Sequence, residues 1–67
     1  MQIKSNTMRK ILKECGAPRV SDEAAKELVT IVNDYAYSVG TSAIEAMKFS
    51  KRITVMSEDI LYAAKHA

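Results

Sequence analysis

The chain has 67 residues, of which 48% are apolar and 27% charged, and its net charge is +2. One cysteine excludes an intrachain disulfide, one histidine is too few for a structural zinc site, and no apolar run is long enough for a membrane span or a signal-peptide core. We therefore expect one domain over residues 1–67, located in the cytoplasm, without cofactor, metal or membrane partner, whose small core needs oligomerisation for further support.

The first predicted element is a short helix that ends near Cys15. Asn6 or Thr7 can cap its start. Gly16 is suited to end it in a left-handed conformation, and Pro18 prevents its continuation. Apolar and cationic residues fall on separate faces at helical spacing. The apolar face holds Met8, Ile11, Leu12 and Cys15, and the cationic face holds Arg9, Lys10 and Lys13.

A long second helix is predicted from Asp22 to about Phe49. Ser21 offers an N-cap hydroxyl, and acidic residues occupy the first turn, where they favour the helix dipole. Apolar residues then keep steps of three or four without a breaker. Gly40 costs about 1 kcal/mol relative to alanine inside a helix, which indicates a close approach by another helix.

The length of this helix predicts a dimer. About 28 residues at 1.5 Å each span ~42 Å, whereas a compact chain of this size is roughly 28 Å across. The short flanking helices cannot cover so long an apolar stripe. We expect two copies of the long helix to cross and cover each other.

Beyond Phe49 the helical pattern stops. Residues 50–52 break it, the β-branched residues 53–55 favour a short strand, and Ser57 can cap a last helix. This helix carries Ile60, Leu61, Ala63 and Ala64. The predicted order is short helix, loop, long helix, loop with a short strand, short helix.

Positive charge is concentrated in two segments far apart in sequence. Residues 1–19 carry five cations and one anion, and residues 48–55 carry three cations and no anion. Residues 20–47 carry five anions and one cation. A polyanion could be bound if folding or assembly joins the two basic segments.

This order of elements, with CGAPRVSDEA before the long helix and KRITVMSEDILYAA after it, resembles the histone fold, above all the small tail-less archaeal histones. The resemblance extends from about Met8 to Ala64. Its most specific parts are Gly-Ala-x-Arg-Val-Ser at 16–21 and Arg-x-Thr-x-x-x-x-Asp at 52–59. It implies an all-α fold and a head-to-tail dimer that compacts or wraps double-stranded DNA in the nucleoid with little sequence specificity.

The resemblance also implies roles for individual residues. The first loop of one chain would lie beside the second loop of its partner, with Arg19 entering a minor groove. Arg52 and Asp59 match an internal salt bridge, and Gly16 matches a small residue that permits protein turns to stack along DNA. The implied DNA-contacting residues are Lys10, Lys13, Arg19, Lys51, Arg52 and Thr54.

The sequence departs from the family pattern at four positions. Ile53 stands where a basic residue is common, and Lys51 where a glycine is common. Phe49 and Tyr62 stand where dimers usually join through a polar, histidine-containing contact. The implied contact between dimers comprises Ala46, Phe49 and Tyr62, and these aromatic side chains leave tetramers or higher assemblies open.

Two alternatives to DNA wrapping remain. The chain could be a histone-fold subunit that pairs with a different chain in a transcription or chromosome complex, with weak or no DNA binding. It could also bridge or bend DNA without continuous wrapping. An enzyme with a small-molecule substrate is not expected, because the acidic pairs lie at helix starts and no base, nucleophile or metal set converges.

Overall fold

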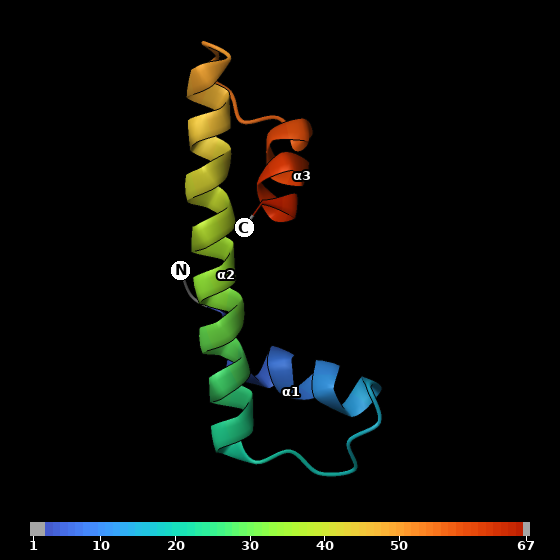
Figure 1. Ribbon diagram of the computed structural model, residues 1–67. Helices are drawn as coiled ribbons and strands as arrows, with labels where there is room; N and C mark the ends of the chain where they lie inside the picture. Colours follow the sequence, from blue (N-terminus) through green and yellow to red (C-terminus); the bar gives the residue numbers. More distant parts are fainter. Residues whose placement is uncertain (1–2, 67) are drawn as a thin grey trace. The chain divides into compact units, whose positions relative to one another are not determined.

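The computed structural model describes residues 3–66, which form three helices (Figure 1). Helix α1 spans Ser5–Glu14, α2 spans Asp22–Phe49 and α3 spans Ser57–Lys65. The all-α class and the order short, long, short are as predicted. The predicted strand is wrong: residues 53 and 54 form a bend, residue 55 has no regular structure, and the described residues include no strand. A strand needs a neighbouring strand to complete its hydrogen bonds.

The chain divides into two compact units, Met1–Asp34 and Tyr35–Ala67. The first unit combines α1 with the first half of α2, and the second combines the rest of α2 with α3.

Helix α1 is closed at its C-terminal end by a Schellman motif. Gly16 has a φ of 118°, its N–H donates to the Lys13 carbonyl at 3.0 Å, and the Ala17 N–H donates to the Leu12 carbonyl at 3.2 Å. The start of α1 differs from the prediction. Lys4 is the N-cap residue, and no side chain caps the helix because the lysine side chain has no hydrogen-bond acceptor; the Lys4 carbonyl accepts the Thr7 N–H at 3.1 Å.

Helix α2 has the predicted bounds. The Ser21 hydroxyl accepts a hydrogen bond from the Ala24 N–H at 3.1 Å and so caps the start. A second Schellman motif closes the end, since the Lys51 N–H donates to the Lys48 carbonyl at 2.9 Å and the Arg52 N–H to the Met47 carbonyl at 3.1 Å. Lys51 takes the left-handed position with a φ of 59°. Glycine usually occupies this position because a Cβ is strained there.

Helix α3 begins one residue away from the predicted cap. Met56 is the N-cap residue, whereas Ser57 is the first residue of the helix. The acceptor comes from Asp59, three residues along, whose carboxylate accepts the Met56 N–H at 2.8 Å. An acid in the first turn therefore satisfies the N–H of the N-cap residue, and Ser57 is not the cap that we expected.

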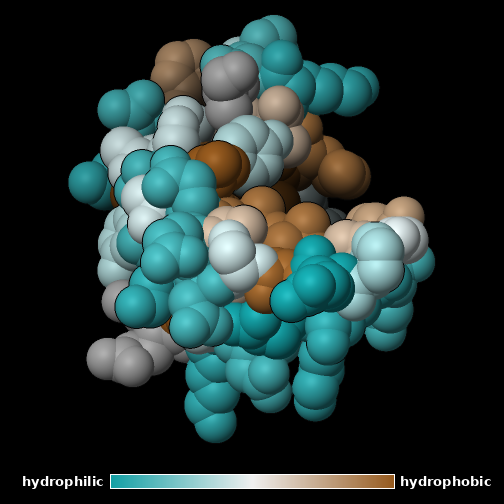
Figure 2. Space-filling model, turned by 90° about the horizontal axis from the view of Figure 1, so that it is seen from below, coloured by the Kyte–Doolittle hydropathy of each residue, from teal (hydrophilic) through white to brown (hydrophobic). Residues whose placement is uncertain are grey.

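The buried apolar residues are few and mostly small. In the first unit they are Met8 and Ala25, and in the second unit Val39, Ala43 and Ala63 form one cluster. Large apolar side chains lie open to solvent, and Figure 2 shows hydrophobic surface exposed among hydrophilic residues. Even Cys15, on the predicted apolar face of α1, is exposed. One chain does not cover its own apolar surface.

Candidate nucleic-acid interface

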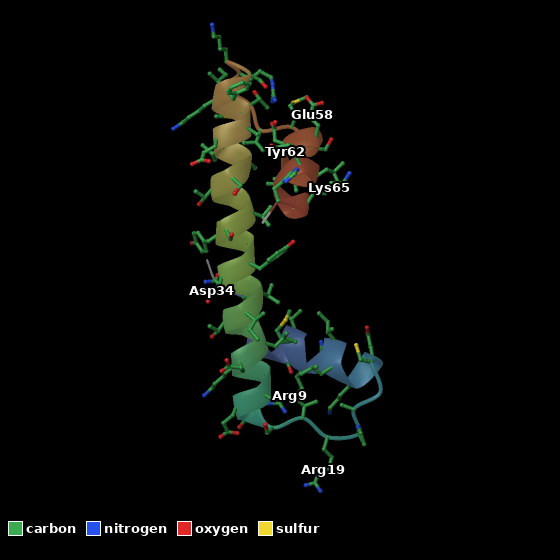
Figure 3. The ribbon with its side chains drawn as sticks, in the orientation of Figure 1. Arg9, Arg19, Asp34, Glu58, Tyr62 and Lys65 are labelled. Atoms are coloured by element: carbon green, nitrogen blue, oxygen red, sulfur yellow. The ribbon has the colours of Figure 1, made fainter. Side chains whose placement is uncertain are left out.

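The first loop, residues 15–21, presents Arg19. The Schellman motif at Gly16 fixes one end of this loop and the Ser21 cap fixes the other. Arg19 is exposed, and Figure 3 shows its side chain pointing away from α1 and α2. The loop therefore holds its cation outward on a short and well-defined stretch of backbone.

Arg9 holds the first loop against α1. Its guanidinium donates to the Val20 carbonyl and forms an ion pair with Asp22 (Figure 3). Sequence reasoning placed Arg9 with the cationic face and missed this role. No local spacing rule could have found it, because the partners lie 11 and 13 residues away and meet Arg9 only after folding.

The other cations of the first unit have different surroundings from Arg9. Lys10 and Lys13 are exposed and lie three residues apart on α1, which places them on one side of the helix. Within residues 3–66, neither lysine nor Arg19 makes a side-chain hydrogen bond or an ion pair. All three charges are available to a ligand.

The second loop, residues 50–56, is organised by Arg52. Its guanidinium forms a bidentate ion pair with Asp59, at 2.7 and 2.8 Å, and donates to the Thr54 carbonyl at 3.0 Å. The structure thus brings Arg52, Thr54 and Asp59 together. Glu58 lies farther from the same guanidinium, at 3.9 Å. Arg52 uses its donors on the loop and on the start of α3.

Asp59 is the only buried charged residue in the part of the chain that the structure describes, with 3% of its surface exposed. The hydrogen bonds from Arg52, and then the one from the Met56 N–H, lower the pKa of Asp59 to about 2 against an ordinary 3.8, although burial opposes this shift. The Asp59 hydrogen bond in turn raises the pKa of Arg52. The pair is charged at neutral pH.

The remaining residues of the second loop face solvent. Lys51 and Thr54 are exposed, and 97% of the surface of Ile53 is accessible. Of the second-loop residues predicted to contact DNA, Lys51 and Thr54 have side chains in solvent, whereas Arg52 is committed to the ion pair. The predicted first-loop and α1 residues lie in the other unit.

The residues predicted for the contact between dimers surround one open groove. Ala46, Phe49 and Tyr62 line it, together with Asp59 and His66. Phe49 is 90% exposed, and the rings of Tyr62 and His66 lie 4.4 Å apart between centroids. Sequence reasoning did not single out His66, which comes near Tyr62 because the two residues are four apart at the end of α3.

Comparison with known proteins gives two concordant results. A family model described as histone-like transcription factor (CBF/NF-Y) and archaeal histone matches residues 1–64. The chain is 39% identical over 56 residues to one of the subunits of archaeal histone HAN1 from Thermococcus zilligii, and 34% identical over 56 residues to probable archaeal histone 3 of Methanocaldococcus jannaschii. Each alignment covers 84% of this chain and 84% of the relative.

Residues 3–66 support neither a metal site nor a membrane-spanning helix. These residues contain no cluster of three or more His, Cys, Asp or Glu side chains arranged to hold a metal ion. None of their helices is long and apolar enough to cross a membrane.

Proposed function

Because the chain belongs to the family of histone-like transcription factors (CBF/NF-Y) and archaeal histones, we propose that it compacts or wraps double-stranded DNA as a homodimer with little sequence preference. Membership of this family gives the chain a histone-type DNA-binding role on the chromosome and makes it a structural protein, not an enzyme. The observation that carries the proposal is the presence of an exposed cation on each of two firmly held loops, Arg19 on the first and Lys51 on the second.

A homodimer accounts for the apolar surface that one chain leaves uncovered. On α2, Ile31, Val32 and Tyr35 are all exposed. At 28 residues α2 is ~42 Å long, so α1 and α3, with ten and nine residues, cannot enclose it. A second α2 crossing the first would bury these side chains, and the two units of each chain would then share in one domain over residues 1–67.

Head-to-tail pairing would also join the two basic segments. The first loop of one chain would lie beside the second loop of its partner at both ends of the dimer. Arg19 would then enter a minor groove next to Lys51 and Thr54, with Lys10 and Lys13 directed to phosphates. Arg52 would act mainly through the shape of the second loop, because its guanidinium is held by Asp59. Gly16 ends α1 and leaves only small atoms at the surface where successive protein turns would stack.

Phe49 favours a second candidate function. Its ring is 90% exposed beside Tyr62, where the sequence predicts a contact between dimers. An apolar contact there would allow two dimers to join as a tetramer. It would equally allow the chain to bind a different histone-fold partner in a transcription or chromosome complex. If the aromatic rings instead block the contact between dimers, isolated dimers would bend or bridge DNA without wrapping it continuously.

Nuclease protection separates these possibilities. The purified protein is mixed with random-sequence duplex DNA, digested with a non-specific nuclease, and the protected fragments are sized. Continuous wrapping gives a regular ladder, whereas isolated dimers or tetramers protect one short length. A stable protein that protects no DNA would contradict the proposed function and favour the role of an interaction partner in a larger complex.

The role of Arg19 is tested by Arg19→Ala. We expect weaker DNA binding and a shallower dependence of log K on log salt, by about 0.9 for each phosphate that the variant no longer neutralises. Lys26→Ala is the matched control, because Lys26 is an exposed cation on α2 outside the proposed DNA-contacting set. Equal binding by Arg19→Ala and Lys26→Ala would show that Arg19 does not contact DNA.

A further inference from the structure

The Arg9 side chain connects α1 to the first loop directly behind Arg19. Its guanidinium donates through Nη1 to the Val20 carbonyl and through Nη2 to the Asp22 carboxylate. These acceptors belong to the residue that follows Arg19 and to the first residue of α2. In Figure 3, Arg9 reaches toward the start of α2, whereas Arg19 points away from both helices. The contact therefore holds the loop from its inner side while Arg19 faces outward.

The backbone on both sides of Arg19 is restrained. Before it, the ring of Pro18 fixes the φ angle of that residue. After it, the Val20 carbonyl is bonded by Arg9. Within residues 3–66, this is the one hydrogen bond that residues 18–20 make. The conformation of the loop at Arg19 thus depends on Arg9.

Arg9 also neutralises the acid that lies closest in sequence after Arg19. Asp22 is three residues along, and its side chain is 77% exposed. A free carboxylate at this distance would compete with phosphate for the Arg19 guanidinium and would repel the DNA backbone. The ion pair with Arg9 satisfies Asp22 instead, and Arg19 keeps its charge for a ligand.

We infer that Arg9 is a positioning residue for DNA binding, which acts through Arg19 and does not itself bind phosphate. This inference rests on the proposed function. A loop that adopts its binding-competent conformation only part of the time binds more weakly in proportion to that fraction. Arginine suits the task because its planar fork reaches two acceptors at once, whereas a lysine ammonium is a point charge on a flexible stem.

The surroundings of Arg9 favour positioning over a direct phosphate contact. Its side chain is 26% exposed, whereas Lys10 and Lys13 on the same helix are open to solvent. Both of its terminal nitrogen atoms already donate to acceptors within the chain. A phosphate would have to displace Val20 or Asp22 to gain these donors.

The test is a double-mutant cycle between positions 9 and 19, measured as the dissociation constant for a random-sequence duplex. Arg9→Lys is the principal variant, because it keeps the net charge and so separates positioning from long-range attraction. Arg9→Ala is the second variant and removes both contacts. Lys13→Ala is the control, because Lys13 is an exposed cation of α1 that shares no partner with Arg19. Circular dichroism confirms that each protein is folded at the temperature of the binding assay.

We expect Arg9→Lys to raise the dissociation constant about 3- to 10-fold, with the salt dependence of wild type. In the Arg19→Ala background the same change should raise it by less than about twofold, because no arginine remains to be positioned. Arg9→Ala should weaken binding further and should also lose part of its effect in that background. Lys13→Ala should weaken binding by the same factor in both backgrounds.

Three results would overturn the inference. In the first, Arg9→Lys binds DNA as wild type does, which would mean that any cation at position 9 suffices. In the second, Arg9→Lys weakens binding by the same factor with and without Arg19. In the third, the loss of affinity disappears once both proteins are fully folded, so that Arg9 would serve stability alone. Failure of the proposed function is distinguishable from these, because wild-type protein would then bind no duplex even at low salt.

Discussion

Replacing Lys51 with glycine is expected to stabilise the fold. Lys51 is the one non-glycine residue with positive φ in the described part of the chain, at 59°. A Cβ costs roughly 1–2 kcal/mol in this region, whereas glycine loses roughly 0.5–1 kcal/mol through the greater freedom of the unfolded chain. The net gain is about 0.5–1 kcal/mol per chain, and 1 kcal/mol raises the Tm of a domain this small by roughly 4–8 °C.

The assay is thermal unfolding followed by circular dichroism at one fixed protein concentration, because the Tm of a dimer depends on concentration. Lys51→Ala removes the same charge but keeps a Cβ in the left-handed position, so its Tm should stay near that of wild type. Both variants should show the same decrease in DNA affinity, since both lack the ammonium. A Tm for Lys51→Gly at or below that of Lys51→Ala would refute the reasoning.

Two further predictions concern Asp59 and Gly40. The pKa of Asp59 is lowered to about 2 from 3.8 in the folded chain, so its charged form stabilises the fold above about pH 4, and this contribution disappears as the pH falls toward 2. The difference in urea midpoint between wild type and Asp59→Asn should therefore be largest near neutral pH and should decrease from pH 4 to pH 2. A difference that does not change with pH would show that the charge of Asp59 does not stabilise the fold. A Cβ added to Gly40 would meet nothing within 4 Å inside one chain, so Gly40→Ala should favour the helix by about 1 kcal/mol unless a partner approaches. If α2 of the partner passes there, as the sequence predicts, the variant should weaken dimerisation in sedimentation equilibrium, whereas a tighter dimer would place the crossing elsewhere.

The bounds of α2 and the end of α1 could be predicted because their signals are local. Apolar periodicity, the Ser21 hydroxyl and the conformational freedom of Gly16 each act within one turn of the helix they define. The starts of α1 and α3 could not be predicted in the same way. Neither N-cap residue, Lys4 or Met56, has the side-chain oxygen of a typical cap, and the Met56 N–H is bonded instead by an acid three residues along.

Only part of the candidate site could be predicted from the sequence, because some of its contacts form only when distant residues meet. The pairing of Arg52 with Asp59 is implied by the family resemblance, through the Arg-x-Thr-x-x-x-x-Asp motif at 52–59, and the structure contains it. Arg9 meets Val20 and Asp22 only through the packing of α1 on α2, so its structural role had no local signal. The three β-branched residues at 53–55 favour a strand by composition, whereas the loop is shaped by the hydrogen bonds of Arg52.

The scarcity of buried apolar residues has a consequence for the cell. With five such residues in the described chain, three of them alanine, we expect folding to be second order in protein concentration. A newly made chain would stay open to proteases until it meets another, and dilution would return dimers to that state. Binding to DNA removes dimers from this equilibrium, so a shortage of DNA would shorten the lifetime of the surplus protein. The amount of protein would then follow the amount of DNA without a dedicated sensor.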